Sequence, residues 1–323
     1  MDKTSAMKDS RTKKRDLLSL KELKRGEIDA ILTLGRRLKR DLKRGVAHRE
    51  LAGKTLALVF EKPSLRTRVS FETGMIQLGG SAIFLGPNEI QLGVRESAAD
   101  CTRVLSRWAD LIVVRTFSHQ TLEEMARHAT VPVINGLTDL FHPCQALADC
   151  FTLIERKGKL DGLKIAFIGD GNNVAHSWIE AAEKFPFSLA VACPEGYEPD
   201  AGLVRAAKKS GARVRITHDA AEAASGADVL YTDVWASMGQ EQEAEVRRRA
   251  FQPYRIDRGL LGRAKKDAVV MHCLPAHRDE EITDEVLEGP QSIVFDQAEN
   301  RLHAQKAIMI WALNGLKGKK KAG

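Results

Sequence analysis

Cations and hydroxyl side chains crowd the stretch FEKPSLRTRVSFE at residues 60–72. It follows the apolar run KTLALVF, which predicts a buried strand, so the stretch itself predicts a helix start. Ser64 is the expected N-cap, and the free N–H groups of a first turn favour an anion. Arg66 adds a planar fork for phosphate or carboxylate oxygens, and Thr67 adds a hydroxyl. Because basic residues there oppose the helix dipole unless an anion is present, the cluster predicts an anion site. The alternative is a capped helix with surface arginines.

A further cation closes the apolar run DLIVVRT at residues 110–116. A charged group at the end of a buried strand needs a counter-ion, because burying an unpaired charge is costly. Arg115 could find it in a structural ion pair or in the same anion. The sequence leaves both possibilities open.

The segment FHPCQALADC at residues 141–150 places His142 and Gln145 in the opening turn of another expected helix, where Pro143 is well suited. His142 could hydrogen-bond a carbonyl oxygen, and the amide of Gln145 offers both a donor and an acceptor. A histidine at such a position is also typical of a helix cap or a core residue, so this segment alone does not define a site.

The segment HCLPAHRDEEIT, which also follows an apolar run, brings a histidine and a cysteine together at His272 and Cys273. With His142 and Cys144 they raise the possibility of a zinc site. Adjacent His-Cys and H-x-C spacings differ from the usual ligand pairs, so we expect no metal. A thiol of Cys273 in a polar, cationic pocket beside substrate fits better.

A glycine pair in IGDGNNVAHS, residues 168–177, resembles part of a dinucleotide fingerprint. Val174 stands where the third glycine should be, although Glu195 could mimic the ribose-binding acid. A nicotinamide dinucleotide site is therefore an alternative. The two asparagines at 172–173 fit better as donors to the carboxylate of an amino acid.

Asp233 follows a strand-like run in YTDVWASMGQE, residues 231–241, ahead of a Ser-Met-Gly loop. Its carboxylate could pair with an ammonium group. A capping or turn aspartate is the common alternative.

Ten apolar runs separated by helix-like segments supply the elements that position these residues. Most are continuous rather than alternating, which is typical of strands buried on both faces of a parallel sheet. The runs span residues 54–60, 81–85, 110–116, 131–135, 163–169, 188–193, 213–217, 228–232, 268–272 and 292–296. We expect an α/β protein with two doubly wound parallel-sheet domains. Residues 142–156 should form a helix between the domains, and a last helix should begin near Glu299 and pack back on the first domain. Ligands in such sheets bind beyond the carboxyl ends of the strands, where the candidates lie.

Composition bounds the class of protein. A chain of 323 residues favours two domains, and no apolar run approaches the roughly 20 residues of a membrane span. Five scattered cysteines and a polar N-terminus favour the cytoplasm over a secreted disulfide protein. The net charge of +7 sits mostly at the chain ends, so we expect solvated tails rather than nucleic-acid binding. A polyanion-binding protein remains the non-enzymatic alternative.

Taken together, six segments resemble those of ornithine carbamoyltransferases, in the same order over nearly the whole chain. They are KPSLRTR, HPCQALAD, GDGNN, DVWASMG, HCLPAHR and FDQAENR. The first, second and fifth are together specific for the carbamoyltransferase superfamily, and DVWASMG resembles the ornithine enzymes in particular. Leu65 departs from the threonine of many members. The hydrogen-bonding neighbours are kept, so we expect little consequence.

The resemblance implies the roles of the site residues. Carbamoyl phosphate would be bound by Ser64, Leu65, Arg66, Thr67, Gln91, Arg115, His142, Gln145, Cys273, Leu274 and Arg301. Among these, Arg115, His142 and Cys273 would act in catalysis, and Gln91 would in some members reach a neighbouring subunit's site. Ornithine would be bound by Asn173, Asp233, Ser237 and Met238.

The implied reaction transfers the carbamoyl group of carbamoyl phosphate to the δ-amine of L-ornithine, giving L-citrulline and phosphate without metal or cofactor. The implied domains span residues 15–147 for carbamoyl phosphate and 148–298 for ornithine, with a C-terminal helix at 299–316. The implied assembly is a homotrimer. Alternatives are a carbamoyltransferase for N-acetyl- or succinyl-ornithine or putrescine, and an NAD-dependent dehydrogenase.

Overall fold

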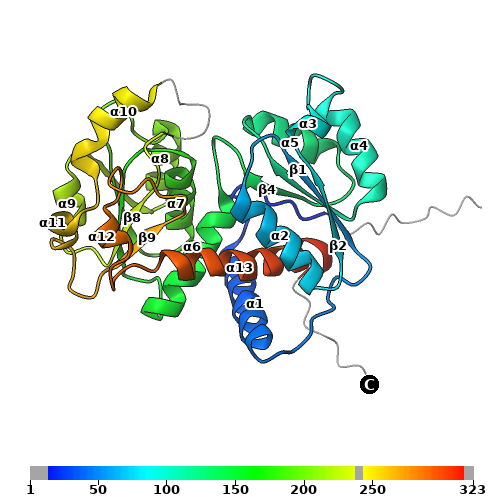
Figure 1. Cartoon of the computed structure of the whole chain (residues 1–323), viewed down its shortest axis with the longest axis horizontal. Helices are drawn as coiled ribbons and strands as arrows, with labels where there is room; N and C mark the ends of the chain where they lie inside the picture. The colour runs from blue at the N-terminus through cyan, green and yellow to red at the C-terminus, as the bar shows by residue number, and fades with distance from the viewer. Residues whose placement is uncertain (1–13, 237–242, 316–323) are drawn as a thin grey trace, which may run out of the picture.

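The computed structural model describes residues 14–236 and 243–315, which form two parallel sheets with helices on their faces (Figure 1). The first sheet has the strand order β2-β1-β3-β4. Its strands are β1 (Thr55–Phe60), β2 (Ser81–Leu85), β3 (Leu111–Arg115) and β4 (Val133–Leu137). The central strands β1 and β3 are buried almost throughout, whereas the edge strand β2 is partly exposed. The continuous apolar runs therefore became central strands, as expected for a parallel sheet.

The second sheet has the strand order β7-β6-β5-β8-β9. Its strands are β5 (Lys164–Ile168), β6 (Ser188–Ala192), β7 (Arg213–Thr217), β8 (Val229–Thr232) and β9 (Val269–His272). All neighbouring strands in both sheets are parallel, which confirms the predicted α/β class with two doubly wound sheets.

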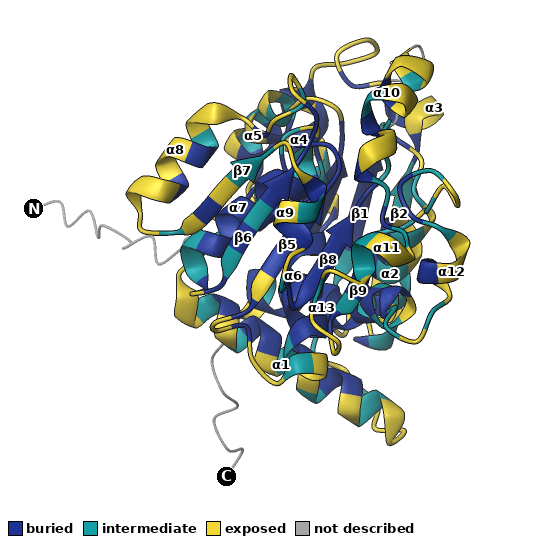
Figure 2. Cartoon of the chain, turned by 90° about the vertical axis from the view of Figure 1, so that its left-hand side faces the viewer, coloured by how far each residue is buried: buried dark blue, intermediate teal, exposed yellow. Residues whose placement is uncertain are grey.

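Helices cover both sheets, and their outer faces are exposed while the central strands are buried (Figure 2). Around the first sheet lie α1 (Arg25–Lys43), α2 (Leu65–Gln77), α3 (Pro87–Ile90), α4 (Ala98–Trp108) and α5 (His119–His128). Around the second lie α7 (Asn173–Lys184), α8 (Ala201–Lys209), α9 (Ala220–Ala224), α10 (Ala244–Phe251), the 3₁₀ turn η2 (Gln252–Tyr254), α11 (Arg258–Leu261) and α12 (Asp284–Leu287). None of these described helices is long and apolar enough to cross a membrane.

Two long helices join the halves in the middle of the molecule (Figure 1). Helix α6 (Pro143–Lys157) contacts both β4 and α7, so it bridges the two sheets as predicted. Helix α13 (Val294–Asn314) packs on α1, α2 and α6, which confirms that the C-terminal helix returns to the first half. It buries Ile308 and Trp311 among other side chains, and each large apolar side chain buried in this way contributes about 1.5–3 kcal/mol.

The predicted strand at residues 292–296 is wrong. Ser292 makes only an isolated bridge to Val270, and α13 begins at Val294, five residues before the predicted start at Glu299. Val294 and Gln297 are buried while Phe295 is 62 % exposed, which is the spacing of a helix rather than of a strand buried on both faces. The run was apolar enough for a strand but too short to reveal its period.

Candidate active site

A cavity of about 1040 Å³ lies at the carboxyl ends of the strands of both sheets, where open parallel sheets bind their ligands. Most of the predicted site residues line it. From the first half and α13 these are Ser64, Leu65, Arg66, Thr67, Arg115, His142, Gln145 and Arg301. From the second half they are Asn173, Asp233, Cys273 and Leu274.

Three predicted residues are not brought to this cavity by the described structure. Gln91 follows α3 with a left-handed backbone (φ 38°); it is exposed and is not among the residues that line the cavity. Ser237 and Met238 lie outside the described residues.

The start of α2 has the predicted capping. The hydroxyl of Ser64 accepts a hydrogen bond from the backbone N–H of Thr67 at 3.3 Å, and the first turn contains no acidic residue. The positive end of the helix dipole and the side chain of Arg66 therefore point toward the cavity without an internal anion to balance them. Register places Arg115 beside this turn, because it pairs with Phe60 across β1 and β3.

Three guanidinium groups converge on the cavity, and we call Arg66, Arg115 and Arg301 the cavity arginines. Within residues 14–236 and 243–315, none of them forms an ion pair with a carboxylate. Arg115 is only 8 % exposed, and its buried Nε has no hydrogen-bond partner among those residues. Burial, followed by the charges of Arg301 and Arg66, lowers the pKa of Arg115 to about 10. The structural ion pair considered for Arg115 is thus absent from the described structure, and the cluster is electrostatically suited to a bound anion.

His142 is buried at the start of α6. Burial and the three cavity arginines hold the pKa of its imidazole well below the ordinary value, so the ring is neutral near pH 7. Its side chain does not cap the helix, and its Nδ1 has no partner within the described part of the chain. The backbone N–H of His142 donates to the hydroxyl of Ser177 on α7 at 2.8 Å, which ties this turn to the second half.

The second half contributes a carboxylate. Oδ1 of Asp233 accepts hydrogen bonds from the Cys273 thiol at 2.9 Å and from the Val234 N–H at 2.8 Å. Oδ2 accepts from the Asn172 amide at 2.8 Å. Burial and the neighbouring Asp233 charge raise the pKa of Cys273 well above its ordinary value, so the thiol keeps its proton and acts as a donor.

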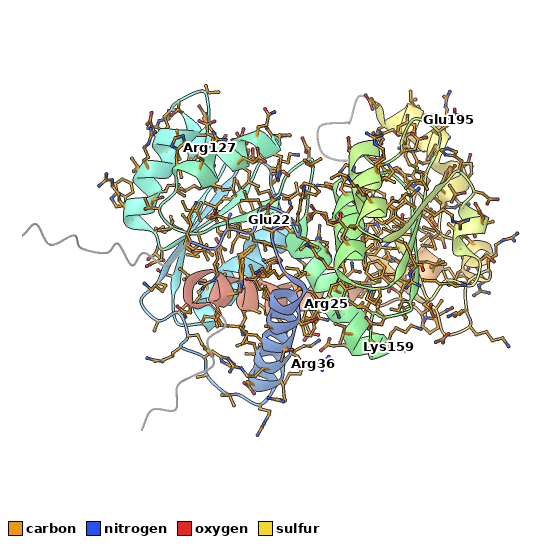
Figure 3. All side chains as sticks on the ribbon, turned by 180° about the vertical axis from the view of Figure 1, so that it is seen from behind. Glu22, Arg25, Arg36, Arg127, Lys159 and Glu195 are labelled. Atoms are coloured by element: carbon orange, nitrogen blue, oxygen red, sulfur yellow. The ribbon has the colours of Figure 1, made fainter. Side chains whose placement is uncertain are left out.

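The dinucleotide interpretation of the glycine pair does not fit this geometry. The side chain of Asn172 accepts from the N–H groups of Val174 and Ala175, so it caps α7 where a diphosphate would bind. Gly171 is needed for packing, because a Cβ there would lie 2.2 Å from the Pro199 nitrogen. Glu195 is exposed on the second half (Figure 3), and it is not among the residues that line the cavity.

The histidine and cysteine that suggested zinc have other partners. Asp233, His272 and Cys273 do place possible ligand atoms within 4.8 Å of one another. Nδ1 of His272, however, accepts from the Leu274 N–H at 2.8 Å, so Nε2 carries the proton and donates to Glu281 at 2.8 Å. His272 therefore has no free nitrogen for a metal without breaking one of these bonds.

Some residues that shape the cavity were missed by sequence reasoning. Lys62 lines its rim, where it pairs with Asp139 and lies over the Phe117 ring. Arg247 lines its far side and pairs with Asp170 at 3.1 Å. A polar residue directly after a strand was the available signal for Asp170. The sequence around Arg247 carries no comparable signal.

Comparisons with known proteins agree with this site. The aspartate/ornithine carbamoyltransferase carbamoyl-P binding domain matches residues 15–155, and the Asp/Orn binding domain of the same enzymes matches residues 161–312. The ornithine carbamoyltransferase of Syntrophus aciditrophicus is 58% identical over 92% of this chain and 98% of its own length. The anabolic ornithine carbamoyltransferase of Pyrococcus furiosus is 52% identical over 94% of this chain and 98% of its own.

Solved structures give the same result. The ornithine carbamoyltransferase structure from Pyrococcus furiosus matches with a TM-score of 0.90 at 51% identity, covering 94% of this chain and 98% of that chain. The Thermus thermophilus enzyme matches with a TM-score of 0.85 at 46% identity, covering 94% of this chain and 100% of that one. With two matched domains, arginines gathered at one edge of the cavity and a carboxylate at the other, the chain belongs to the aspartate/ornithine carbamoyltransferase family.

Proposed function

We propose that this cavity transfers the carbamoyl group of carbamoyl phosphate to the δ-amine of L-ornithine, giving L-citrulline and phosphate. One observation carries the assignment: the cavity arginines, which have no carboxylate partner among the described residues, line the same cavity as a hydrogen-bonded carboxylate, Asp233. A dianion and an amino acid that bears an ammonium group complement these two ends.

Carbamoyl phosphate is assigned to the first half. Its phosphate lies on the α2 start, held by the side chains of Ser64, Arg66, Thr67 and Arg115 and the backbone at Leu65. Its carbamoyl group lies toward His142, Gln145, Arg301 and the backbone at Cys273 and Leu274. Gln91 reaches the same substrate in a neighbouring subunit.

Ornithine is assigned to the second half. Asp233 pairs with its α-ammonium group. Asn173, Ser237 and Met238 also bind its α-carboxylate and α-amino groups. A blocked α-amine or a diamine without a carboxylate gains less from this arrangement. The site therefore favours free ornithine over N-acetyl-ornithine, succinyl-ornithine and putrescine.

The chemistry needs positioning and oxyanion stabilisation rather than a metal or cofactor. The neutral δ-nitrogen attacks the carbamoyl carbon, forming a C–N bond, and the C–O bond to phosphate then breaks. Arg115, Thr67 and a neutral His142 donate to the oxygen that becomes negative, and removing one such donor typically costs ~10²–10³ in rate. Because Cys273 already holds a proton, the leaving phosphate takes the proton released by the amine.

Residues 15–147 bind carbamoyl phosphate and residues 148–298 bind ornithine, with α6 shared between the two domains and α13 packed on the first. A homotrimer would use the exposed apolar side chains beside the site. Leu65 and Ile76 on α2 and Ile83 on β2 are 72%, 64% and 53% exposed in the single chain. All five cysteines are free thiols, which fits a reducing cytoplasm.

Citrulline formation from carbamoyl phosphate tests the function, with L-ornithine, N-acetyl-L-ornithine and putrescine compared at equal concentration. We expect strong preference for L-ornithine. Preference for another amine would overturn the assignment of Asp233, and absence of carbamoyl transfer to all three would overturn the function.

A further inference from the structure

The side-chain amide of Gln145 is held in one orientation by two neighbours of opposite character. Its oxygen accepts a hydrogen bond from Nη1 of Arg301 at 2.6 Å. Its nitrogen donates to Oδ1 of Asp149 at 2.7 Å, one helical turn along α6. Arginine can only donate, and an ionised carboxylate can only accept. The two contacts therefore assign the oxygen and nitrogen of Gln145 from chemistry alone.

Asp149 is itself fixed from three elements. Besides Gln145 of α6, its carboxylate accepts from the Tyr231 hydroxyl of β8 at 2.9 Å and from the Gln297 amide of α13 at 2.8 Å. The oxygen of Gln297 in turn accepts from the backbone N–H of His272 at 2.9 Å, next to Cys273. Asp149 is fully buried. A buried carboxylate with three donors is satisfied only in this arrangement, so it cannot turn without leaving a donor unpaired.

The mechanism proposed above makes no use of Asp149. It does not line the cavity, whereas Gln145, to which it is hydrogen-bonded, does. Turning the amide of Gln145 would place its oxygen against the Asp149 carboxylate and its nitrogen against Arg301, so both contacts would be lost. What the orientation changes is the group that Gln145 can offer to the cavity: an oxygen with a remaining lone pair beside Arg301, rather than a second N–H.

We propose that Asp149 is a positioning residue that fixes the amide of Gln145 with its oxygen available to the NH₂ of the carbamoyl group, so that the site selects a carbamoyl over an acyl phosphate. This inference rests on the proposed function. Acetyl phosphate is the matched probe, because it replaces the carbamoyl NH₂ by a methyl group of similar size and keeps the phosphate.

Asp149→Asn replaces one accepting carboxylate oxygen by a donating NH₂ group without changing the side-chain volume. The new amide can present N–H₂ to Gln145, which favours turning the Gln145 amide and withdraws its oxygen from the carbamoyl group. Burial raises the pKa of Asp149 to about 7, against the hydrogen bonds of Gln145, Gln297 and Tyr231 and the charge of Arg301. Measurements at pH 8 therefore compare the variant with a mainly ionised carboxylate.

The experiment measures KM for carbamoyl phosphate and Ki for acetyl phosphate as its competitor, each with the full chain at pH 8. For the wild-type protein we expect a Ki/KM ratio of roughly 10 or more, the effect of one well-placed hydrogen bond. In Asp149→Asn the ratio should fall to about 1, a loss of roughly tenfold. The matched control is Thr152→Val, which removes another buried hydrogen-bonding group on α6, the hydroxyl that accepts from Asn300 at 3.0 Å. It should keep the wild-type ratio.

A double variant keeps the test sharp if Asp149→Asn folds poorly. In Gln145→Glu with Asp149→Asn, the asparagine can donate to the new glutamate, whose other oxygen accepts from Arg301 and faces the cavity. Total charge and volume are unchanged, and the Ki/KM ratio should return to within about threefold of wild type.

An unchanged Ki/KM ratio in Asp149→Asn, or a Ki/KM ratio that stays near 1 in a folded double variant, would overturn the inference. Citrulline formation by the wild-type protein reports separately on the proposed function, and a wild-type ratio near 1 with normal citrulline formation would overturn only the role of Asp149.

Discussion

The two halves of the cavity are prepared for their substrates in opposite ways. The first half gathers the cavity arginines without a carboxylate partner in the described structure, together with the open first turn of α2. The second half presents Asp233, whose oxygens already accept hydrogen bonds from Cys273, Asn172 and Val234. The charged groups of the first half therefore lack described partners of opposite charge, whereas the carboxylate of the second half already has its hydrogen bonds.

This difference has an energetic consequence. Arg115 and Arg301 are buried cations with no carboxylate partner among the described residues, which is unfavourable, and binding of a dianion offsets that cost. Ornithine must instead compete with contacts that Asp233 already makes. The geometry thus favours strong binding of carbamoyl phosphate first. Ornithine then binds more weakly, because it must replace hydrogen bonds that Asp233 already accepts.

The largest effect should come from removing a cavity arginine. In Arg66→Ala the phosphate loses a planar, charge-assisted donor pair, and we expect kcat/KM for carbamoyl phosphate to fall ~10²–10³-fold with the circular dichroism spectrum unchanged. Arg68→Ala is the matched control. Arg68 lies on the same helix but pairs with Glu72 and lies over Phe84, so its loss should change kcat/KM by less than about twofold. Near-normal turnover in Arg66→Ala would contradict the assignment of the phosphate to the cavity arginines.

A smaller effect should follow from neutralising the second half. Asp233→Asn keeps the shape of the side chain but removes the charge that pairs with the α-ammonium group. We expect KM for ornithine to rise roughly 10- to 100-fold while KM for carbamoyl phosphate changes little. Steady-state kinetics with each substrate varied in turn separates the two values. Equal rises in both would mean that the halves are not independent.

Substituting the thiol should cost less again. If Cys273 acts as a neutral donor to Asp233, serine can replace it, and Cys273→Ser should lose no more than about tenfold in kcat. A thiolate acting as general base would predict a loss of ~10²–10⁴ instead. The kcat of the serine variant at saturating substrates decides between the two.

The smallest expected effect concerns pH. Because the pKa of His142 is lowered well below its ordinary value by burial and by the cavity arginines, we expect no change in the charge of the ring between pH 6.5 and 8. His142→Asn should therefore reduce kcat/KM for carbamoyl phosphate without changing the shape of its pH profile in that interval. An acid limb near pH 6.5 that disappears in the variant would show that His142 titrates there.

Local signals were easiest to predict from sequence. The anion-binding turn occupies a few consecutive residues after a strand, so Ser64, Arg66 and Thr67 could be placed together from types and spacing. The partners of Arg115 could not, because they depend on which strands pair and on what α13 brings from the far end of the chain. Arg301 was predicted only from the family resemblance.

Residues 292–296 were misassigned because a short apolar run fits a strand and a buried helix equally well. Asp149 carried a usable signal, its i,i+4 spacing from Gln145, but its importance appears only once three elements are seen to converge on it.

A crystal structure with phosphonoacetamide, a stable analogue that replaces the bridging oxygen of carbamoyl phosphate by a methylene group, tests the central claim most directly. The account predicts the phosphonate at the α2 start, within hydrogen-bond distance of Ser64, Arg66, Thr67 and Arg115, and the amide nitrogen against the oxygen of Gln145. A phosphonate bound elsewhere in the cavity, with the arginines uninvolved, would contradict it.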